Sequence, residues 1–445
     1  MDKNKCPFNA LSEPDGPKGL SIILIAHNAL KFLLGIQEKY GDISQYKMLG
    51  ITNYLITYPD DISQVFKDEK QGKYRKTWFH KAFYSFFGNG LFNSYGEDWK
   101  KQRDQLQPIF NRSEIKKWFP LIAEEALNHL TPIGNTSKIN AEDVIKPLMQ
   151  NIMSRILFGQ NNEDSKKAIL AIEEISEQLA NHGLKSFIFN GILNRLPTPG
   201  NLRYKVSLKT IDKSIENMSN NIDDMKDTNA LLPIFSKFML PKELRDQLTT
   251  FYFAGQETTV NTLLWTIYYL AKHPEYQERA RNEILKKLPA ERNIDFNDLN
   301  TFAFLNAAIN ESMRLAPVAF MMSRDIDQDV QISKYKLKKE SLVMLSPYVT
   351  HRHPDLWNNP SEYNPDRFLN RKNKSYSFFP YGGGMRICIG MHLAKMEITT
   401  IMAVFISKFK FELNPVKKVE PITHLILKPN NLHLVIHKID NNSLS

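Results

Sequence analysis

A single cysteine in a glycine-rich segment is the strongest candidate for chemistry in this sequence. Residues 378–394 read FFPYGGGMRICIGMHLA, and the run from Gly382 to Gly384 predicts a loop, because glycine is costly inside a helix. Residues after Gly390 repeat with helical period, so Cys388 is expected just before the N-terminus of a helix. That position favours a thiolate, which can ligate a metal ion while nearby backbone amides tune it. The alternative is a buried structural cysteine.

A second candidate lies at the centre of a long apolar stretch, residues 243–273. Ala254 and Gly255 form a small-residue patch that lets a bound group approach the helix backbone closely. Thr258 can hydrogen-bond the carbonyl four residues back, which opens the helix and leaves room for water. Glu257 is an acid among apolar residues, which suits a proton relay. The alternative is an ordinary helix-interior threonine beside a glutamate that caps a neighbouring charge.

An acid and two arginines form a third candidate group. Glu311 and Arg314 stand three residues apart on an expected helix, so they share a face and can form a buried ion pair. Arg367 offers a second guanidinium that can hold the acid and fix the segment leading to the Cys388 loop. Removing one partner of a buried ion pair lowers the free energy of unfolding by about 3–5 kcal/mol. The alternative is a surface ion pair of little energetic value.

These segments resemble the cytochrome P-450 superfamily. Residues 384–390 fit the pattern GxRxCxG, which arises by chance in under about one chain of this length in a hundred. Other motifs of that family occur here in the family's order: WxxxR at Trp99 and Arg103, AGQETT at 254–259, ExxR at Glu311 and Arg314, and PDRF at 365–368, where Asp366 replaces the usual glutamate. Each motif alone is weak, but five in one order are specific.

The resemblance implies haem b (iron protoporphyrin IX) as the cofactor and O2 as the co-substrate. A cysteine thiolate is the proximal iron ligand in that family, which implies this role for Cys388. Arginine suits bidentate binding of the two haem carboxylates. Tyr381 stands where the family usually has phenylalanine. The residues implied to bind the cofactor are Trp99, Arg103, Ala254, Gly255, Arg324, Tyr381, Gly382, Arg386, Cys388 and Gly390, while Thr258 and Glu257 are implied to deliver protons.

Apolar side chains that precede the Trp99 helix, lie in the central stretch 243–273 or follow the Glu311 helix are candidates for the substrate pocket. If they line a pocket, the substrate is apolar and sizeable. Clusters of methionine and aromatic residues are more often plain core than a ligand site, which is the alternative. The pocket candidates are Phe79, Phe83, Phe87, Phe253, Val318, Phe320 and Met321.

Secondary-structure patterns place these candidates in a mainly α fold with a smaller β portion, and the resemblance implies the cytochrome P-450 fold with a long central helix. Residues 94–315 repeat with helical period, whereas strand patterns occur near 43–60, 318–348 and 408–438. A further helix is expected over 28–41, and a turn at 429–431. No linker or repeat interrupts the sequence, which predicts a single domain over residues 1–445, and the resemblance implies that it is a haem domain.

Composition limits the cellular setting of the 445-residue chain. Two cysteines, Cys6 and Cys388, exclude a disulfide framework and a four-cysteine zinc site. The apolar run at 20–26 is too short for a membrane helix, so we expect a soluble cytoplasmic protein without a transmembrane anchor. A weak surface contact of the N-terminal segment with a membrane stays open. The formal charge of +10 favours an acidic partner.

The leading hypothesis is a haem-thiolate monooxygenase that hydroxylates an apolar substrate, with a fatty acid first and a steroid or terpenoid second. Because the sequence has no GxGxxG dinucleotide motif and no length for a flavin module, we expect the electrons to come from a separate protein. The surplus of positive charge favours an acidic ferredoxin or flavodoxin, with its reductase, as that partner. We expect a monomer and no nucleic-acid partner. A peroxide-driven hydroxylase or isomerase is one alternative, and a non-catalytic haem-binding ligand sensor is another; the pair Glu257 and Thr258 argues against both.

Overall fold

The computed structural model of the chain describes residues 11–19, 21–76, 83–188, 198–224, 228–288, 292–369 and 374–439. Contacts divide the chain into two units. The sheet unit comprises Met1–His80, Met313–Tyr363 and Asn370–Cys388, and the helical unit comprises Lys81–Ser312, Asn364–Leu369 and Ile389–Ser445. That the whole chain forms one domain stays a prediction.

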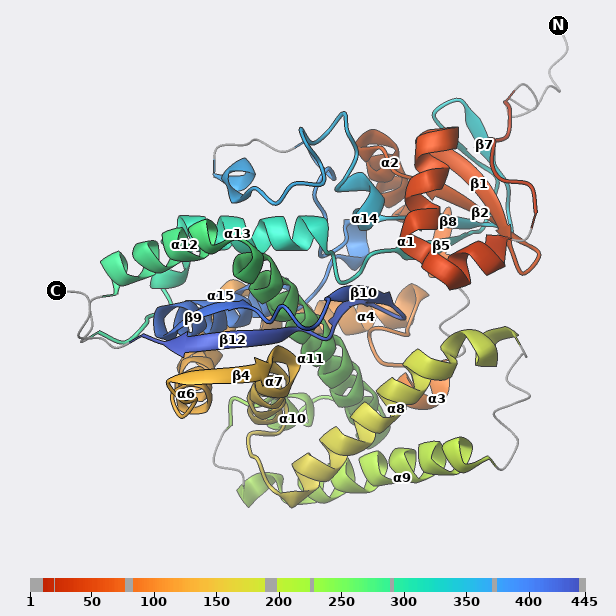
Figure 1. Ribbon diagram of the computed structural model, residues 1–445. Helices are drawn as coiled ribbons and strands as arrows, with labels where there is room; N and C mark the ends of the chain where they lie inside the picture. The colour runs from red at the N-terminus through yellow and green to blue at the C-terminus, as the bar shows by residue number, and fades with distance from the viewer. Residues whose placement is uncertain are drawn as a thin grey trace, which may run out of the picture. The chain divides into compact units, whose positions relative to one another are not determined.

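The sheet unit is built on a five-stranded sheet with the strand order β1-β2-β8-β5-β3 (Figure 1). Strands β2 and β8 run parallel, whereas the other neighbours in this sheet are antiparallel. A separate hairpin pairs β6 with β7. The elements are α1 (Ser21–Tyr40), β1 (Ile43–Met48), β2 (Ile51–Ile56), α2 (Pro59–Glu69), β3 (Tyr74–Lys76), β5 (Met322–Ile326), β6 (Val330–Ile332), β7 (Tyr335–Leu337), β8 (Leu342–Leu345), α14 (Pro347–Thr350) and the 3-10 turn η9 (Gly384–Arg386).

The core of the sheet unit forms between its sheet and α2. Ile56 on β2, Val343 and Leu345 on β8, and Ile326 on β5 are all buried together with Phe66 of α2. Burying a side chain of this size stabilises the fold by about 1.5–3 kcal/mol. This packing fixes the end of α2 and the strand β5, and both elements carry charged residues of the candidate site.

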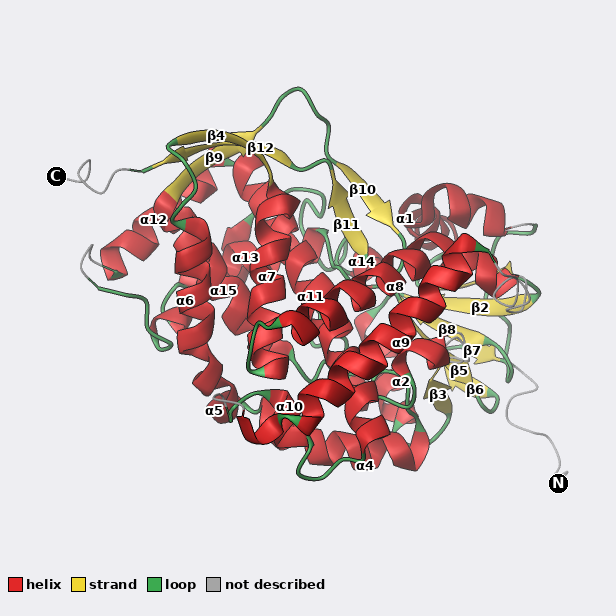
Figure 2. Cartoon of the chain, turned by 90° about the horizontal axis from the view of Figure 1, so that it is seen from below, coloured by secondary structure: helices red, strands yellow, loops and turns green. Residues whose placement is uncertain are grey.

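The helical unit contains most of the helices and two small sheets (Figure 2). One sheet has the order β4-β12-β9, and the other pairs β10 with β11. The elements are α3 (Tyr84–Phe87), α4 (Gly96–Leu106), η3 (Gln107–Phe110), α5 (Arg112–Ile115), η4 (Lys116–Trp118), α6 (Phe119–Leu130), β4 (Thr136–Asn140), α7 (Ala141–Phe158), α8 (Glu163–Ile188), α9 (Pro199–Asn220), η6 (Ile222–Asp224), α10 (Leu231–Phe235), α11 (Pro241–Lys272), α12 (Pro274–Lys287), η7 (Asp298–Asn300), α13 (Ala303–Leu315), η8 (Pro365–Phe368), α15 (Met391–Lys408), β9 (Phe409–Leu413), β10 (Glu420–Thr423), β11 (Leu427–Asn430) and β12 (His433–Lys438).

The 32-residue helix α11 is the longest in the described part of the chain and carries the acid and threonine (Figure 1). Pro241 occupies its first turn, where the missing amide hydrogen costs nothing. The Glu243 carboxylate accepts the backbone N–H of Leu240 at 3.0 Å, which caps the helix start. Helix α7 packs along α11, and α8 and α9 lie side by side in the same unit. The contact with α7 supports the helix that carries Glu257 and Thr258.

The predicted fold class is confirmed, with three local differences. A strand, β4, lies within the expected helical region, because it pairs with β12 from the far end of the sequence. Helix α1 begins at Ser21 and is interrupted at Asn28, whose side chain accepts the Lys31 amide hydrogen at 2.9 Å. The turn predicted at 429–431 is shifted, since Pro429 lies in β11 and the positive φ of 58° occurs at Asn431.

Candidate cofactor and active site

The loop that carries Cys388 is held by its own backbone within the sheet unit. The Cys388 N–H donates to the Tyr381 carbonyl at 3.0 Å, and the Gly382 N–H donates to the Phe379 carbonyl at 3.0 Å. Gly382 and Gly384 have φ values of +74° and +64°, which side-chain-bearing residues rarely adopt. The Cys388 thiol is exposed. The loop therefore presents the thiol outward on a fixed backbone, as a metal ligand requires.

The glycines of this loop are also required by close packing on α2. A Cβ atom at Gly383 would come within 2.6 Å of the Phe66 ring and 2.5 Å of the Tyr376 ring. A Cβ atom at Gly384 would come within 2.9 Å of Phe66. The run of glycines thus lets the loop lie directly against the aromatic core of the sheet unit.

A buried histidine that the sequence analysis missed anchors the loop. The ring of His351 accepts the backbone N–H of Phe379 at 3.0 Å, and Arg314 donates to the His351 carbonyl at 2.7 Å. Burial, together with the charges of Arg314 and Arg352, holds the pKa of His351 well below its usual range. The ring is therefore neutral and can accept the Phe379 N–H. No local pattern marks this role, because the partner lies 28 residues away.

We expect His351→Phe to lower the free energy of unfolding by about 1–3 kcal/mol, because it leaves the buried N–H of Phe379 without its acceptor. Urea unfolding followed by circular dichroism measures this loss, and haem content per polypeptide shows whether the loop still binds its cofactor. His351→Gln keeps an acceptor and serves as the matched variant. Equal stability of His351→Phe and the wild type would contradict the anchoring role.

Arg314 donates hydrogen bonds to backbone carbonyls of the sheet unit. Its guanidinium donates to the carbonyls of His351 and Pro360, each at 2.7 Å, and of Glu362 at 2.9 Å. It also lies 5.0 Å from the centroid of the Trp357 ring. The side chain is fully buried, so these carbonyls replace the water that a guanidinium otherwise needs. Arg314 therefore fixes the chain on either side of Trp357.

Glu311 links α13 to η8 within the helical unit. One carboxylate oxygen accepts the Asn364 N–H at 2.9 Å and lies 3.3 Å from Nε of Arg367. Glu311 is fully buried, and the Arg367 side chain is 10% exposed. The expected contact between Glu311 and Arg367 is therefore present. The Asp366 carboxylate points to a different partner, Arg279, at 2.8 Å.

Two guanidinium groups gather around one buried acid in the sheet unit. Nε of Arg324 lies 2.6 Å from a Glu69 carboxylate oxygen, and Nε of Arg386 lies 3.9 Å from the same oxygen. Lys76 on β3 stands directly opposite Arg324 on β5. The sequence analysis identified both arginines but missed Lys76 and Glu69, which lie in an undistinguished run of charges at 67–76.

Trp99 and Arg103 lie four residues apart on α4 of the helical unit, so they share one face of that helix. Trp99 is buried, whereas Arg103 is half-buried. This spacing lets an indole N–H and a guanidinium serve one carboxylate group.

The centre of α11 carries the residues that the sequence marked for proton transfer. The Thr258 hydroxyl donates to the Ala254 carbonyl at 2.7 Å, the expected bond to the residue four positions back. Ala254 is exposed, and Thr258 and Glu257 are half-buried. Burial raises the pKa of Glu257, and the charges of Lys146 and Lys428 oppose that rise. The raised pKa brings this carboxyl closer to the range in which an acid can both donate and accept a proton.

Gly255 has a packing role that the sequence analysis did not anticipate. A Cβ atom there would come within 2.8 Å of the terminal methyl group of Met153 on α7. Glycine at this position therefore leaves room for the flexible end of the Met153 side chain between α7 and α11. Its predicted role toward the cofactor stays a prediction.

The predicted pocket residues fall into separate groups. In the helical unit the ring centroids of Phe87 and Phe253 lie 5.0 Å apart, and Phe83 lies 6.2 Å from Phe87. In the sheet unit Val318 and Phe320 are buried, whereas Met321 is half-buried. Phe79 lies outside the described residues. Contact of any of these residues with a substrate stays a prediction.

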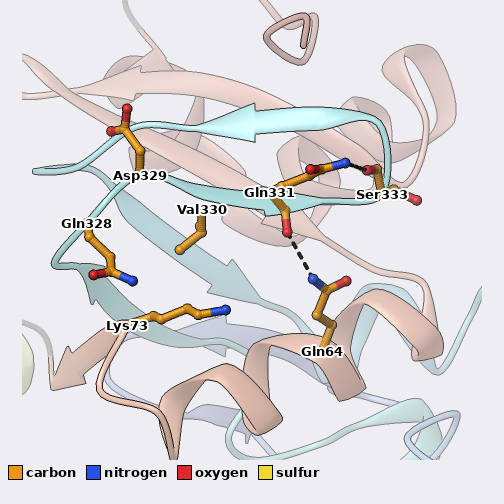
Figure 3. Close-up of a pocket in the computed structure, with 7 residues that line it drawn as sticks. All are labelled: Gln64, Lys73, Gln328, Asp329, Val330, Gln331 and Ser333. Atoms are coloured by element: carbon orange, nitrogen blue, oxygen red, sulfur yellow. Dashed lines mark hydrogen bonds between the residues drawn. The ribbon is translucent and has the colours of Figure 1, made fainter. Parts of the chain in front are cut away.

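A pocket of about 620 Å³ in the sheet unit lies apart from this chemistry (Figure 3). Its charged lining residues are already paired, Lys73 with Asp68 at 2.9 Å and Asp329 with Lys336 at 2.8 Å. None of the sequence-predicted site residues lines it. The lining residues are Gln64, Lys73, Gln328, Asp329, Val330, Gln331 and Ser333.

Known proteins resemble this chain in sequence along most of its length. The family model for cytochrome P450 matches residues 14–436. The chain belongs to the cytochrome P450 family.

Individual cytochrome P450 relatives cover nearly the whole chain. Cytochrome P450 714C3 of Oryza sativa subsp. japonica is 25% identical over 452 aligned residues, which cover 96% of this chain and 87% of that protein. Cyclooctatin synthase of Streptomyces melanosporofaciens is 26% identical over 440 aligned residues, which cover 94% of each protein. The crystal structure of the cytochrome P450DA heme domain shares the fold, with a TM-score of 0.83, 19% identity, and coverage of 97% of this chain and 98% of that one.

This cytochrome P450 is therefore a monooxygenase that uses haem b and O2, and its electrons come from a redox partner. The described residues fit that cofactor. They contain no group of three or more histidine, cysteine or acidic side chains able to hold a metal ion. A porphyrin needs only an axial ligand from the protein, which an exposed thiol can provide. The two haem carboxylates fit the cationic cluster around Glu69. Among the described helices, none is long and apolar enough to cross a membrane.

Proposed function

We propose that Cys388 is the axial ligand of the haem iron and that Trp99, Arg103, Arg324 and Arg386 bind the haem carboxylates. The exposed thiol on a hydrogen-bonded loop supports the first assignment. The assignment of the carboxylate-binding residues is supported by Arg324 and Arg386, which both lie near the buried Glu69. Their two guanidinium groups concentrate positive charge at one place, where haem carboxylates could bind. Tyr381, Gly382 and Gly390 shape the loop, and Ala254 and Gly255 leave room beside α11.

We further propose that Thr258 and Glu257 deliver protons during turnover. Bound haem supplies the O2 chemistry that inserts one oxygen atom into a substrate C–H bond and sends the other to water, with two electrons and two protons. The Thr258 hydroxyl, oriented by its bond to the Ala254 carbonyl, positions water through its oxygen. The Glu257 carboxyl, whose Oε2 lies 3.3 Å from the Asn261 amide nitrogen, exchanges protons with that water.

We expect Thr258→Ala to retain haem and substrate binding but to release most of the consumed oxygen as H2O2. The variant loses the hydroxyl that orients water, and positioned acid delivery contributes roughly 10²–10⁴-fold. The measurement is the ratio of hydroxylated product to H2O2 at saturating substrate and redox partner. Thr258→Ser keeps a hydroxyl and is the matched control. An unchanged ratio in Thr258→Ala would remove Thr258 from the proton-delivery residues.

The substrate we propose is an apolar organic molecule, with a fatty acid as the first choice. The observation that carries this proposal is the aromatic pair Phe87 and Phe253, which stands next to the exposed Ala254 on α11. Aromatic rings favour apolar ligands, and the half-buried Thr258 follows four residues after Ala254. A steroid or terpenoid is the second choice.

A spectral titration of the haem protein with fatty acids, sterols and terpenes tests the substrate proposal. We expect saturable changes in the haem spectrum with fatty acids, and weaker binding in Phe87→Ala. Saturation by sterols or terpenes with no response to fatty acids would replace the first choice with the second.

An acidic ferredoxin or flavodoxin, with its reductase, is the electron donor that we propose. Arg112 on α5 and Lys395 on α15 both lower the pKa of His392, after burial as the main cause, so positive charge gathers at the start of α15. Lys100 and Lys101 on α4 are exposed cations of the same unit. Cys388 precedes α15 by three residues, so the patch lies close in sequence to the proposed iron ligand.

Arg112→Glu should raise the KM for an acidic ferredoxin several-fold and weaken the salt dependence of the rate, because opposite charges steer the encounter. Steady-state turnover with ferredoxin as the varied component measures both. Lys209→Glu makes the same charge change at another exposed site, on α9, and should leave the KM unchanged. Equal effects of the two variants would refute a specific docking patch.

The monomeric state and cytoplasmic location remain predictions from the sequence. Size-exclusion chromatography with light scattering, and fractionation of the host cells, test them separately.

A further inference from the structure

Two polar side chains near the start of α11 hold the loop that follows α3, within the helical unit. The Asp246 carboxylate accepts the backbone N–H of Asn89 at 3.0 Å. The side-chain oxygen of Gln247 accepts the backbone N–H of Leu91, also at 3.0 Å. Both side chains are buried. Because a buried N–H that loses its acceptor costs free energy, these two bonds fix the loop at 88–91 on α11.

Two glycines allow this loop to lie directly on the helix. Gly88 has a φ of +51°, and a Cβ atom there would come within 1.9 Å of the Asp246 carboxylate. A Cβ atom at Gly90 would come within 2.3 Å of the Thr250 hydroxyl and 2.7 Å of the Asp246 backbone carbonyl. The carbonyl belongs to the helix backbone, which does not move aside as the end of a long side chain does. The loop therefore follows the surface of α11 from Asp246 to Thr250.

Arg245 attaches α3 itself to the same helix. Its guanidinium donates to the Phe86 carbonyl and lies 3.3 Å from the Asp246 carboxylate. Its Nε also donates to Asp212 on α9 at 2.7 Å. The side chains of Arg245 and Asp246 are 13% and 7% exposed, whereas that of Asp212 is 59% exposed. The buried contacts of Arg245 are therefore the ones that hold α3.

This attachment sets the position of the aromatic rings proposed for the substrate pocket. Asp246, Thr250 and Phe253 recur every three or four residues, so they share one face of α11. Phe87 directly precedes Gly88, and its ring centroid lies 5.0 Å from that of Phe253. The bond that holds the loop and the aromatic contact thus lie along one face of the helix, about two turns apart. Movement of the loop away from Asp246 would therefore carry Phe87 away from Phe253.

We propose that three polar residues, Arg245, Asp246 and Gln247, are positioning residues for the substrate pocket. They hold the loop at 88–91 and the end of α3 on α11, and these in turn hold Phe87 in place. The inference rests on the proposed role of Phe87 in substrate binding. It adds that this role depends on polar side chains that the sequence analysis did not single out.

Hydrogen–deuterium exchange of the haem-loaded protein measures the attachment without any measurement of activity. In Asp246→Ala the backbone N–H of Asn89 loses its acceptor, so exchange over residues 86–94 should be about tenfold or more faster than in the wild type. Asp246→Asn keeps an acceptor oxygen and should lie closer to the wild type. Asp212→Ala removes the exposed partner of Arg245 and is the matched control, which should exchange as the wild type does. Wild-type exchange over 86–94 in Asp246→Ala would overturn the attachment.

Titration with 4-phenylimidazole and with imidazole then measures the effect on the pocket, because both ligate haem iron but only the first carries a phenyl ring. Phe87→Ala and Asp246→Ala should each lower the ratio of the 4-phenylimidazole affinity to the imidazole affinity by about two- to tenfold, since an aromatic contact is lost or displaced. In the double variant the loss should equal that of Phe87→Ala alone. Gln247→Ala removes the acceptor of the Leu91 N–H and replaces Asp246→Ala if that variant does not fold.

The outcomes separate this inference from the proposal on which it rests. A wild-type affinity ratio in Asp246→Ala, together with a lowered ratio in Phe87→Ala, would overturn the inference alone. Additive losses in the double variant would also overturn it, because Asp246 would then act independently of Phe87. A wild-type ratio in Phe87→Ala would refute the proposed role of Phe87, and the inference with it.

Discussion

Cys388→Ser is expected to abolish monooxygenase turnover and the spectral signature of thiolate ligation. A serine hydroxyl stays protonated near neutral pH, so it cannot replace the thiolate that favours O–O cleavage in this family. The loop itself should survive, because the Cys388 backbone N–H still donates to the Tyr381 carbonyl. The effect should therefore fall on the iron site, with little change in the fold.

Three measurements make this prediction specific: product formation with the redox partner, the spectrum of the reduced CO complex, and the thermal unfolding midpoint. Cys6→Ser exchanges the other cysteine of the sequence and should behave as the wild type in all three. Wild-type turnover in Cys388→Ser would refute the assignment of the axial ligand.

Glu311→Ala should lower the free energy of unfolding by about 3–5 kcal/mol and yield little haem-loaded protein. The change removes the acceptor of the Asn364 N–H and the carboxylate beside Arg367, and it leaves a guanidinium that is 10% exposed without that counter-charge. Urea unfolding and the ratio of haem to polypeptide measure the two effects. Substrate choice should stay unchanged in whatever holoenzyme forms.

Glu311→Gln separates the two contributions, because its amide oxygen can still accept the Asn364 N–H while the charge is lost. We expect the free energy of unfolding and the haem content of this variant to lie between those of Glu311→Ala and the wild type. A normal yield of stable holoenzyme from Glu311→Ala would show that the ion pair of Glu311 and Arg367 contributes as little to stability as a surface ion pair.

Local sequence patterns were sufficient to predict the long helix of the acid and threonine, and the loop of Cys388. The stretch 243–273 is long and densely apolar with polar residues clustered at its centre, and three successive glycines exclude a helix at 382–384. The hydrogen bond from Thr258 to Ala254 is also local, since it spans four residues of one helix. Features that involve residues close together in the sequence depend on short stretches of chain. Their physical causes can therefore be identified in the sequence.

The residues that were missed depend on partners far away in the sequence. Glu69 meets Arg324 across 255 residues, and His351 meets Phe379 across 28. Strand β4 forms only because β12 supplies its neighbour. Nothing in a local pattern distinguishes Lys76 from other lysines of its charged run. Only the strand register that pairs it with Arg324 reveals its position.

The absorbance spectrum of the reduced, CO-bound protein tests most directly the claim that Cys388 ligates the haem iron as a thiolate. We expect a strongly red-shifted Soret band in the wild type, and its loss in Cys388→Ser. A wild-type spectrum without that shift, in protein carrying one haem per chain, would contradict thiolate ligation and the proposed roles that depend on it.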